Sequence, residues 1–313
     1  MPRLVFDGRA VEAAEGQTVL DAVGIALDRS CRAGICQSCL VQKVEGDLLA
    51  AAQAGLTPAQ QAQGLFLACV CTPTGPLSIM PADAARHRTE ARVRSLDRLS
   101  NSVVRLRLEP AAPFPYRAGQ FVNLMLDGLV RSYSLAGQPD SDDFLELHVR
   151  ILADGRMSQR IANDLAPGSR LIVAGPAGGC FYEGVDPDQP LVLAGTGTGL
   201  APLWGILNDA LGRGHRGPIR LYHGALSADG LYLVEEIRTL ARQHANLEYL
   251  PCVRGADGGG DLVQAVLAKE QAPKEGWYFL CGDPALVAGL RKSLFLAGAR
   301  RDRIRADAFV QAA

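Results

Sequence analysis

The spacing of apolar residues changes twice along the chain and divides it into three segments. In the first, short apolar runs flank Asp7-Gly8, a pair typical of a two-residue hairpin turn. Thr18 precedes the apolar run 19–23, which predicts a short helix capped by the threonine hydroxyl. Further strands are predicted at 40–44 and 65–70. This pattern indicates a small α+β module, which we place at residues 1–85.

The second segment alternates apolar and polar residues with a period of two, as half-buried strands do. The alternation is clearest at 103–108, 121–126 and 145–151, and Gly and Pro residues separate these stretches. Many short strands with such turns are typical of a small antiparallel barrel. We therefore predict a β-barrel over residues 86–186.

The start of this segment, residues 86–98, contains five arginines and little apolar content. We interpret it as a solvated linker that enters the barrel. The alternative is a contact for an acidic partner or for a phosphate group.

In the third segment, residues 187–313, apolar runs alternate with helix-like stretches. The apolar runs lie at 191–194, 219–223, 247–253 and 278–281, and the helix-like stretches at 201–213, 234–244, 261–270 and 284–297. Alternation of this kind predicts a parallel sheet covered by helices. The whole chain is therefore expected to be a multidomain protein of mixed α+β and α/β class.

Composition narrows the function classes. The 313 residues are 48% hydrophobic and 21% charged, with 32 basic and 33 acidic side chains. A net charge of −1 gives no case for nucleic acid or an anionic membrane as partner. The most apolar stretch, 191–207, contains four glycines and a proline, so no membrane span is expected. The first residues do not resemble a secretory signal, and we expect a cytoplasmic protein, in which clustered cysteines favour ligands over disulfides.

Four cysteines carry the most specific motif. Cys31, Cys36, Cys39 and Cys69 have the spacing C-x4-C-x2-C followed by 29 residues and a fourth Cys. This is the plant-type pattern of ligands for a [2Fe–2S] cluster. Cys71 is an alternative fourth ligand. A structural zinc site is the competing interpretation, but it usually has paired C-x2-C knuckles.

Two short motifs in the barrel segment together describe a flavin site. In Arg131-Ser132-Tyr133-Ser134, the Arg can bind a phosphate, the Tyr ring can stack on a heterocycle, and Ser134 can bond a ring nitrogen. Gly155-Arg156-Met157-Ser158 precedes a helix-like run and suits a diphosphate at a helix N-terminus. Either motif alone could be a surface turn.

Two further motifs lie in the third segment. The run from Gly195 to Gly199, Gly-Thr-Gly-Thr-Gly, follows an apolar strand and opens a helix, where glycines let backbone amides approach a diphosphate. It departs from the G-x-G-x-x-G fingerprint at Leu200, so a plain glycine-rich turn is the alternative. Cys281-Gly282-Asp283-Pro284 ends a later strand, at the sheet edge that faces a ligand crevice.

With these motifs in this order, the chain resembles the ferredoxin–NADP⁺-reductase-like flavoproteins that carry an N-terminal plant-type ferredoxin. Such proteins are reductase components of bacterial multicomponent oxygenases, of the benzoate, naphthalene and carbazole dioxygenase types. The resemblance spans essentially the whole chain. It implies a β-grasp ferredoxin domain, an FAD-binding β-barrel and an NAD(P)H-binding parallel-sheet domain. The acceptor would be an oxygenase component or an intermediate ferredoxin; a deoxysugar dehydratase is the alternative acceptor, and a non-catalytic zinc scaffold is the other alternative.

The resemblance also assigns roles to individual residues. Ser134, Cys281 and Phe309 would act at the flavin and nicotinamide rings, and the four cysteines would hold the cluster. The cofactor-binding residues would be Arg131, Tyr133, Ser134, Gly155, Met157, Ser158, Gly195, Thr196, Gly197, Thr198, Gly199, Cys281, Gly282, Asp283, Pro284 and Phe309. Leu226 departs from the family pattern, in which many relatives carry Arg after Tyr-x-Gly-Ala.

The implied activity converts two-electron into one-electron transfer. A nicotinamide donates hydride, a [2Fe–2S] cluster accepts single electrons, and FAD can do both. We expect NADH rather than NADPH, because the loop 224–230 has no basic residue for a 2′-phosphate, whereas Asp229, Glu235 and Glu236 would repel one. Arg254 could reverse this preference.

Other residues that could carry chemistry are interpreted as structural. Cys252 and Cys180 are expected to pack in the core, although Cys180 could also lie near the flavin. His148 and His223 lie in strand patterns with no evident ligand partner.

Overall fold

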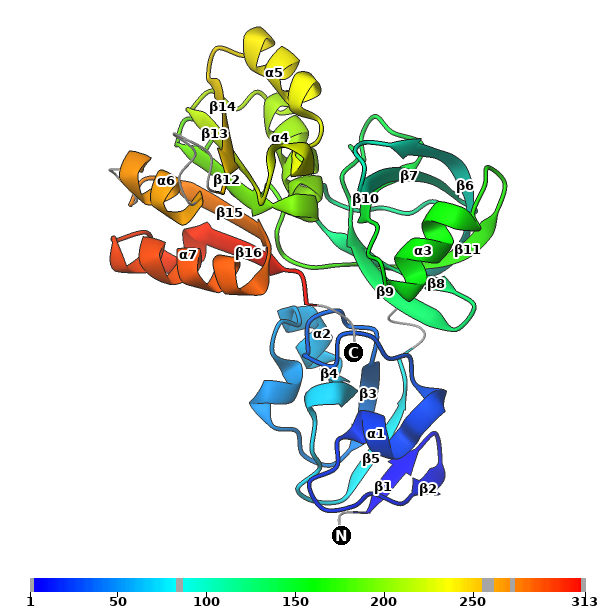
Figure 1. Ribbon diagram of the computed structural model, residues 1–313. Helices are drawn as coiled ribbons and strands as arrows, with labels where there is room; N and C mark the ends of the chain where they lie inside the picture. Colours follow the sequence, from blue (N-terminus) through cyan, green and yellow to red (C-terminus); the bar gives the residue numbers. More distant parts are fainter. Residues whose placement is uncertain (1–2, 83–86, 255–261, 271–273, 311–313) are drawn as a thin grey trace.

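The computed structural model describes residues 3–82, 87–254, 262–270 and 274–310. It forms three domains, which we call the N-terminal, barrel and C-terminal domains (Figure 1). The boundary expected between residues 85 and 86 lies outside the described residues. Within the described part of the chain, no helix has the length and apolar character needed to cross a membrane.

The N-terminal domain is a five-stranded mixed sheet with short helices packed against it. Its elements are β1 (Leu4–Phe6), β2 (Arg9–Val11), α1 (Val19–Val23), β3 (Leu40–Glu45), α2 (Pro58–Ala62), β4 (Leu65–Leu67) and β5 (Leu77–Pro81). The order is β2-β1-β5-β3-β4, with β1 and β5 parallel, which is the predicted β-grasp arrangement. Asp7 and Gly8 have positive φ, as a hairpin turn of this type requires. The Thr18 hydroxyl accepts from the Asp21 N–H at 3.2 Å and caps α1.

The barrel domain is a six-stranded antiparallel sheet. Its elements are β6 (Arg88–Arg98), β7 (Val103–Pro110), β8 (Phe121–Leu126), β9 (Leu129–Ser134), β10 (Leu145–Arg150), α3 (Arg156–Asn163) and β11 (Arg170–Ala177). The order is β10-β7-β6-β11-β8-β9, and a bridge between Leu135 and Leu147 joins its two ends. The barrel is therefore closed, and alternate residues of each strand fill its core.

The linker interpretation of residues 86–98 is wrong for the described residues, because Arg88–Arg98 is a long strand of the barrel. Thr89, Ala91 and Val93 point inward and are buried, while the charged residues that alternate with them, Arg88, Glu90, Arg92 and Arg94, face outward. The inward positions are small, so the alternation is weak in the sequence. The arginines extend from the outer face of the strand, where Arg94 pairs with Asp143.

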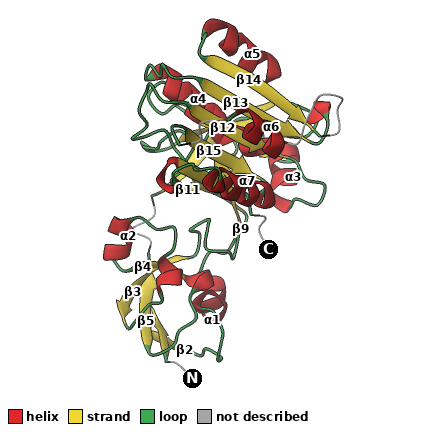
Figure 2. Cartoon of the chain, turned by 90° about the vertical axis from the view of Figure 1, so that its left-hand side faces the viewer, coloured by secondary structure: helices red, strands yellow, loops and turns green. Residues whose placement is uncertain are grey.

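The C-terminal domain is a five-stranded parallel sheet with helices on both faces. Its elements are β12 (Leu191–Thr196), α4 (Leu200–Gly212), β13 (Ile219–Ala225), α5 (Val234–Gln243), β14 (Leu247–Val253), α6 (Leu262–Lys269), β15 (Trp277–Gly282), α7 (Pro284–Leu296) and β16 (Ile304–Ala308). Residues of α4 and α5 share one core with the sheet, and residues of α6 and α7 share another. Figure 2 shows α6 and α7 on the face turned to the viewer.

The strand order in this sheet is β14-β13-β12-β15-β16. From β12 the chain adds β13 and β14 on one side and then β15 and β16 on the other, so the switch point lies between β12 and β15. Such a switch point opens a crevice at the carboxyl ends of the strands, where ligands bind. The Gly195–Gly199 run forms the end of β12 and the turn into α4, and Cys281-Gly282-Asp283-Pro284 forms the end of β15 and the start of α7. Both predicted nucleotide motifs therefore lie at the switch point. β16 was not predicted; it brings Asp307 to the same edge of the sheet.

Candidate functional site: a cysteine loop, a flavin motif and a nucleotide crevice

The cysteine loop folds back on itself so that its backbone amides face sulfur. The N–H groups of Ala33 and Cys36 both donate to Cys31 Sγ at 3.4 Å. Gly34 has φ +74° and lies against Val70, so this close approach requires glycine. The four predicted ligands are 2–8% exposed. Backbone N–H groups that point at sulfur would stabilise the negative charge of thiolates that hold a cluster.

The four thiols form two pairs. The neighbouring Cys36 thiol lowers the pKa of Cys31, and the neighbouring Cys39 thiol lowers the pKa of Cys69. Among the described residues, no group of three His, Cys, Asp or Glu side chains is arranged to hold one metal ion. Four cysteines in two neighbouring pairs provide the number of thiolates that a [2Fe–2S] cluster needs.

Cys71, the alternative fourth ligand, lies apart from this pairing. It is 3% exposed and packs in the core of the N-terminal domain. Burial raises the pKa of its thiol to about 11, so it stays protonated. The structure thus places Cys69, and not Cys71, beside Cys39.

The flavin motif occupies the end of β9. Tyr133 is partly buried, and burial raises its pKa, so the phenol remains neutral. Ser134 is 7% exposed, and its hydroxyl donates to Asp307 Oδ2 at 3.2 Å. This bond joins the barrel to β16 of the C-terminal domain. Burial raises the pKa of Asp307 to about 6.

The second flavin motif forms the N-cap and the first turn of α3. The Ser158 hydroxyl accepts from the Leu152 N–H and donates to the Gly155 carbonyl, both at 3.1 Å. A Cβ on Gly155 would lie 2.3 Å from the Ser158 oxygen, which explains the glycine. Met157 is buried in the barrel core. The backbone amides of the first turn of α3 are the groups left to face a diphosphate.

The glycines of the nucleotide motif have different environments. A Cβ on Gly199 would lie 2.4 Å from the Cys281 carbonyl oxygen, and one on Gly195 would lie 2.7 Å from Leu203. These two allow the ends of β12 and β15 to approach. Gly197, with φ +54°, has open space around it, and the nearest atom to its Cβ position is Arg150 Nη1 at 3.9 Å. Arg150 is exposed at the end of β10, and no sequence motif marked it.

The residues after β15 form the other wall of the crevice. The Asp283 N–H donates to Thr196 Oγ1 at 3.3 Å, and the Asp283 carboxylate caps α7, with Pro284 as its first residue. The Phe309 N–H donates to the Gly282 carbonyl at 2.8 Å, so the predicted terminal aromatic residue is held beside this turn.

Cys281 is fully buried, and its sulfur lies 3.6 Å from Cys180 Sγ. Burial raises the Cys281 pKa well above its ordinary value, so the thiol is neutral. Cys180 is in the core, as predicted, and Cys252 is too.

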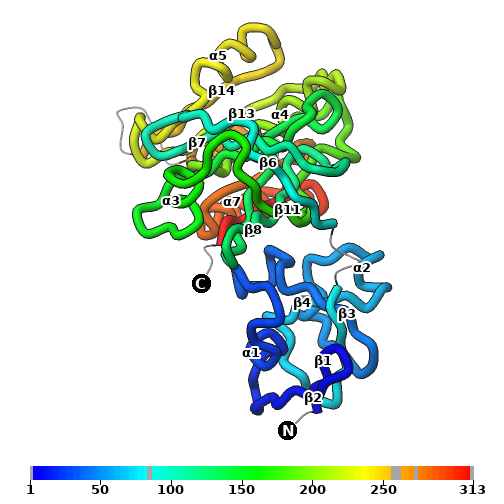
Figure 3. The backbone as a smooth tube through the Cα atoms, turned by 90° about the vertical axis from the view of Figure 1, so that its right-hand side faces the viewer, coloured from blue at the N-terminus to red at the C-terminus, as the bar shows by residue number. Residues whose placement is uncertain are grey.

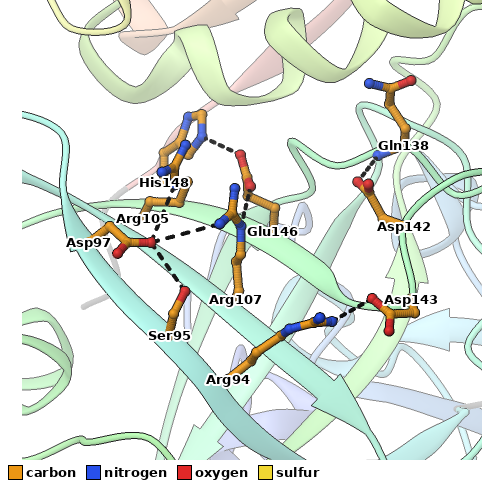
Figure 4. A network of polar contacts seen from close by, with 10 residues as sticks. All are labelled: Arg94, Ser95, Asp97, Arg105, Arg107, Gln138, Asp142, Asp143, Glu146 and His148. Carbon is orange, nitrogen blue, oxygen red and sulfur yellow. Dashed lines mark hydrogen bonds and ion pairs between the residues drawn. The ribbon is translucent and has the colours of Figure 1, made fainter.

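Figure 4 shows a polar network of barrel residues, which includes Glu146 and His148. Glu146 accepts from Arg107 Nε at 2.8 Å and lies 3.1 Å from His148 Nε2. His148 Nδ1 lies 3.2 Å from the hydroxyl of Tyr232, which follows β13. His148 and His223, the two histidines in strand patterns, therefore both have hydrogen-bond partners within the protein. The partner of His223 is the Tyr249 hydroxyl, at 3.1 Å.

Comparison with known proteins agrees with this geometry. A 2Fe-2S iron-sulfur cluster binding domain matches residues 5–74, an oxidoreductase FAD-binding domain matches 90–182, and an oxidoreductase NAD-binding domain matches 193–292.

Relatives match along most of their length. The reductase subunit of an aromatic O-demethylase from Amycolatopsis is 34% identical over 91% of this chain and 91% of its own. The ferredoxin–NAD(P)(+) reductase component of a naphthalene 1,2-dioxygenase system from Pseudomonas putida is 29% identical, covering 97% and 96%. A CDP-6-deoxy-L-threo-D-glycero-4-hexulose-3-dehydrase reductase from Yersinia pestis is 28% identical, covering 94% and 93%.

Among solved structures, the cytochrome P450 reductase GcoB from Amycolatopsis superposes with a TM-score of 0.72 at 28% identity and covers 99% of both chains. The predicted three-domain fold and the three predicted cofactors are thereby confirmed. The chain belongs to the family of electron-transferring oxidoreductases that join a [2Fe–2S] ferredoxin domain, an FAD-binding domain and an NAD-binding domain in one polypeptide.

Proposed function

We propose that this chain is the reductase component of a multicomponent oxygenase that hydroxylates or demethylates aromatic compounds. It would transfer electrons from NADH through FAD and the [2Fe–2S] cluster to an oxygenase component or an intermediate ferredoxin. The observation that carries this proposal is the bond between Ser134 and Asp307, because it holds the flavin motif at the switch point of the nucleotide sheet. Hydride transfer requires that contact between the two sites.

The barrel residues would hold FAD. Arg131 and the first-turn amides of α3 would bind its diphosphate, with Gly155, Met157 and Ser158 shaping that turn. Tyr133 would stack on the ring system, and Ser134 would hydrogen-bond its edge. FAD, when bound, supplies the chemistry that accepts hydride and releases single electrons.

The crevice residues would hold NADH. The loop from Gly195 through Thr196, Gly197 and Thr198 to Gly199 would present its amides to the diphosphate, and Arg150 would add a positive charge beside Gly197. Cys281, Gly282, Asp283 and Pro284 would form the wall beside the nicotinamide. Phe309, fixed through its amide, would cover the flavin ring until nicotinamide enters.

The cysteine loop would hold the cluster through the thiolates of Cys31, Cys36, Cys39 and Cys69. The cytoplasmic location expected from the sequence remains part of the proposal. We also retain the proposed domain boundaries, after residues 85 and 186.

NADH preference rests on the loop after β13. Leu226, Ser227, Ala228 and Asp229 are exposed there and include no cation. Arg254 is exposed nearby, and its backbone N–H donates to the Ala225 carbonyl at 3.0 Å. We expect kcat/KM for NADH to exceed that for NADPH, since Asp229 repels a 2′-phosphate. Equal values, or a preference for NADPH that Arg254→Ala removes, would contradict this expectation.

The acceptor is tested by reconstitution. The purified reductase and NADH would be mixed with an aromatic-ring oxygenase component, or with a deoxysugar dehydrase, the acceptor suggested by the name of the Yersinia relative. The proposal expects coupled product formation with the oxygenase component and markedly slower electron transfer to the dehydrase. The opposite ranking would favour the second function.

A further inference from the structure

The N-terminal domain contacts the barrel through one buried, uncharged hydrogen bond. Asn123 Nδ2 donates to the backbone carbonyl of Cys36 at 3.0 Å. Asn123 lies on β8 and is only 7% exposed. Figures 1 and 3 both show the β8 side of the barrel adjoining the N-terminal domain.

The position of Asn123 on its strand is informative. Its neighbours Val122 and Leu124 point into the barrel core, so Asn123 points out of the barrel, where a polar side chain normally meets solvent. Here the cysteine loop covers it. A buried amide must find partners, and Asn123 uses both ends of its side chain.

The other end of the amide is tied to the flavin motif. Ser132 is paired with Asn123 across β8 and β9, and its hydroxyl donates to Asn123 Oδ1 at 2.7 Å. Ser132 stands between Arg131 and Tyr133, the proposed flavin-binding residues. Because the Asn123 carbonyl accepts from Ser132, its NH2 group is directed at the cysteine loop.

We propose that Asn123 is a positioning residue for electron transfer between flavin and cluster. It seats the Cys36 side of the cysteine loop on the strand pair that carries the flavin motif, through a continuous path from Ser132 to Asn123 to Cys36. This inference rests on the proposed flavin site. It goes beyond that site because Asn123 belongs to none of the cofactor motifs.

The ion pair between these domains cannot replace this bond. Arg88 on β6 forms an ion pair with Asp28, with side chains 34% and 26% exposed. A partly exposed ion pair is screened by salt and fixes geometry weakly. The buried amide is the contact that fixes the distance between the flavin motif and the cluster ligand.

The test compares Asn123→Leu, which keeps the shape but removes the amide, with Asn163→Leu as a matched control. Asn163 is an exposed asparagine at the end of α3 in the same domain. In Asn123→Leu, we expect the rate of cluster reduction by reduced flavin to fall about five- to tenfold, the factor that corresponds to one lost hydrogen bond. Flavin reduction by NADH, iron content and FAD content should stay at wild-type values.

A second readout needs no turnover. Amide hydrogen exchange in the oxidised, fully loaded protein should rise at residues 31–39 in Asn123→Leu and remain unchanged in Asn163→Leu. Asn123→Gln, which restores an NH2 donor, should recover part of both effects.

Three outcomes would overturn the assignment. Unchanged cluster reduction with unchanged exchange would show that the bond does not position the loop. A loss of iron in parallel with the rate would show a structural role in holding the cluster. A fall in flavin reduction with unaltered exchange at 31–39 would indicate that the flavin site itself is misplaced, which is a failure of the proposed function.

Discussion

At the scale of single residues, Cys36 and Cys71 are buried thiols of one domain with different surroundings. Replacing Cys36 with Ser is expected to remove most of the cluster, because Cys36 is paired with Cys31 in the proposed ligand set. Flavin reduction by NADH should remain nearly unchanged, because Ser134 and Cys281 lie in other domains. Iron and sulfide analysis together with stopped-flow flavin absorbance measures both effects.

The matched control is Cys71→Ala. Cys71 packs in the core, so its loss should lower the free energy of unfolding by about 1 kcal/mol and leave iron content intact. Loss of iron in this variant, with retention in Cys36→Ser, would reverse the ligand assignment.

The protonation of the Asp307 carboxyl makes the free energy of unfolding depend on pH. Its pKa is raised by burial to about 6 in the folded protein, above the ordinary value of 3.8. The folded state therefore binds a proton more tightly, and the destabilising effect of the charge begins as pH rises above the ordinary value and is complete above the raised one. Asp307→Asn should increase the free energy of unfolding by about 3 kcal/mol at pH 8 and little at pH 4. An equal change at both pH values in denaturant titrations would contradict this.

At the scale of elements, two glycines in the turn between β12 and α4 have different roles: Gly199 allows close packing, and Gly197 lies where the nucleotide is proposed to bind. Gly199→Ala places a methyl group against the Cys281 carbonyl, so the ends of β12 and β15 must separate. We expect a clearly lowered Tm. Gly197→Ala meets open space and carries only the strain of its positive φ, about 1 kcal/mol.

Gly197→Ala should therefore remain folded and instead raise KM for NADH, because its methyl group would occupy the space proposed for the diphosphate. Thermal melting and steady-state kinetics on both variants distinguish the two roles. A wild-type KM in folded Gly197→Ala would exclude this loop from nucleotide binding.

The strands differ in how far the sequence predicts them. β7, β8 and β10 were predicted because large apolar side chains alternate along them. β6 was missed because its inward residues are small and its outward residues are mostly arginines. β16 was missed because Ile304–Ala308 is polar and pairs on one side only, as an edge strand.

At the scale of the whole molecule, the function depends on contacts between domains. Short sequence motifs do not predict these contacts. Ser134 and Asp307 are 173 positions apart, and Cys36 and Asn123 are 87 apart. The motifs predicted which residues bind each cofactor, because glycine loops and cysteine spacing are local. They did not predict Asn123, Arg150 or the partner of Ser134, because those contacts exist only after three separate domains have docked.

The contacts between domains connect the three proposed cofactor sites in order. The bond from Ser134 to Asp307 joins the nucleotide crevice to the flavin motif, and the bonds from Ser132 through Asn123 join the flavin motif to Cys36. The barrel is thus central, with the nucleotide sheet on one side and the cysteine loop on another (Figure 1).

The most direct test of this account is an anaerobic rapid-scan measurement of the fully loaded protein mixed with NADH. The account predicts that the flavin absorbance bleaches first and the iron–sulfur absorbance follows, with a rate independent of NADH concentration once the flavin is reduced. Bleaching of the cluster before the flavin, or no bleaching by NADH in protein that contains FAD and iron, would contradict it.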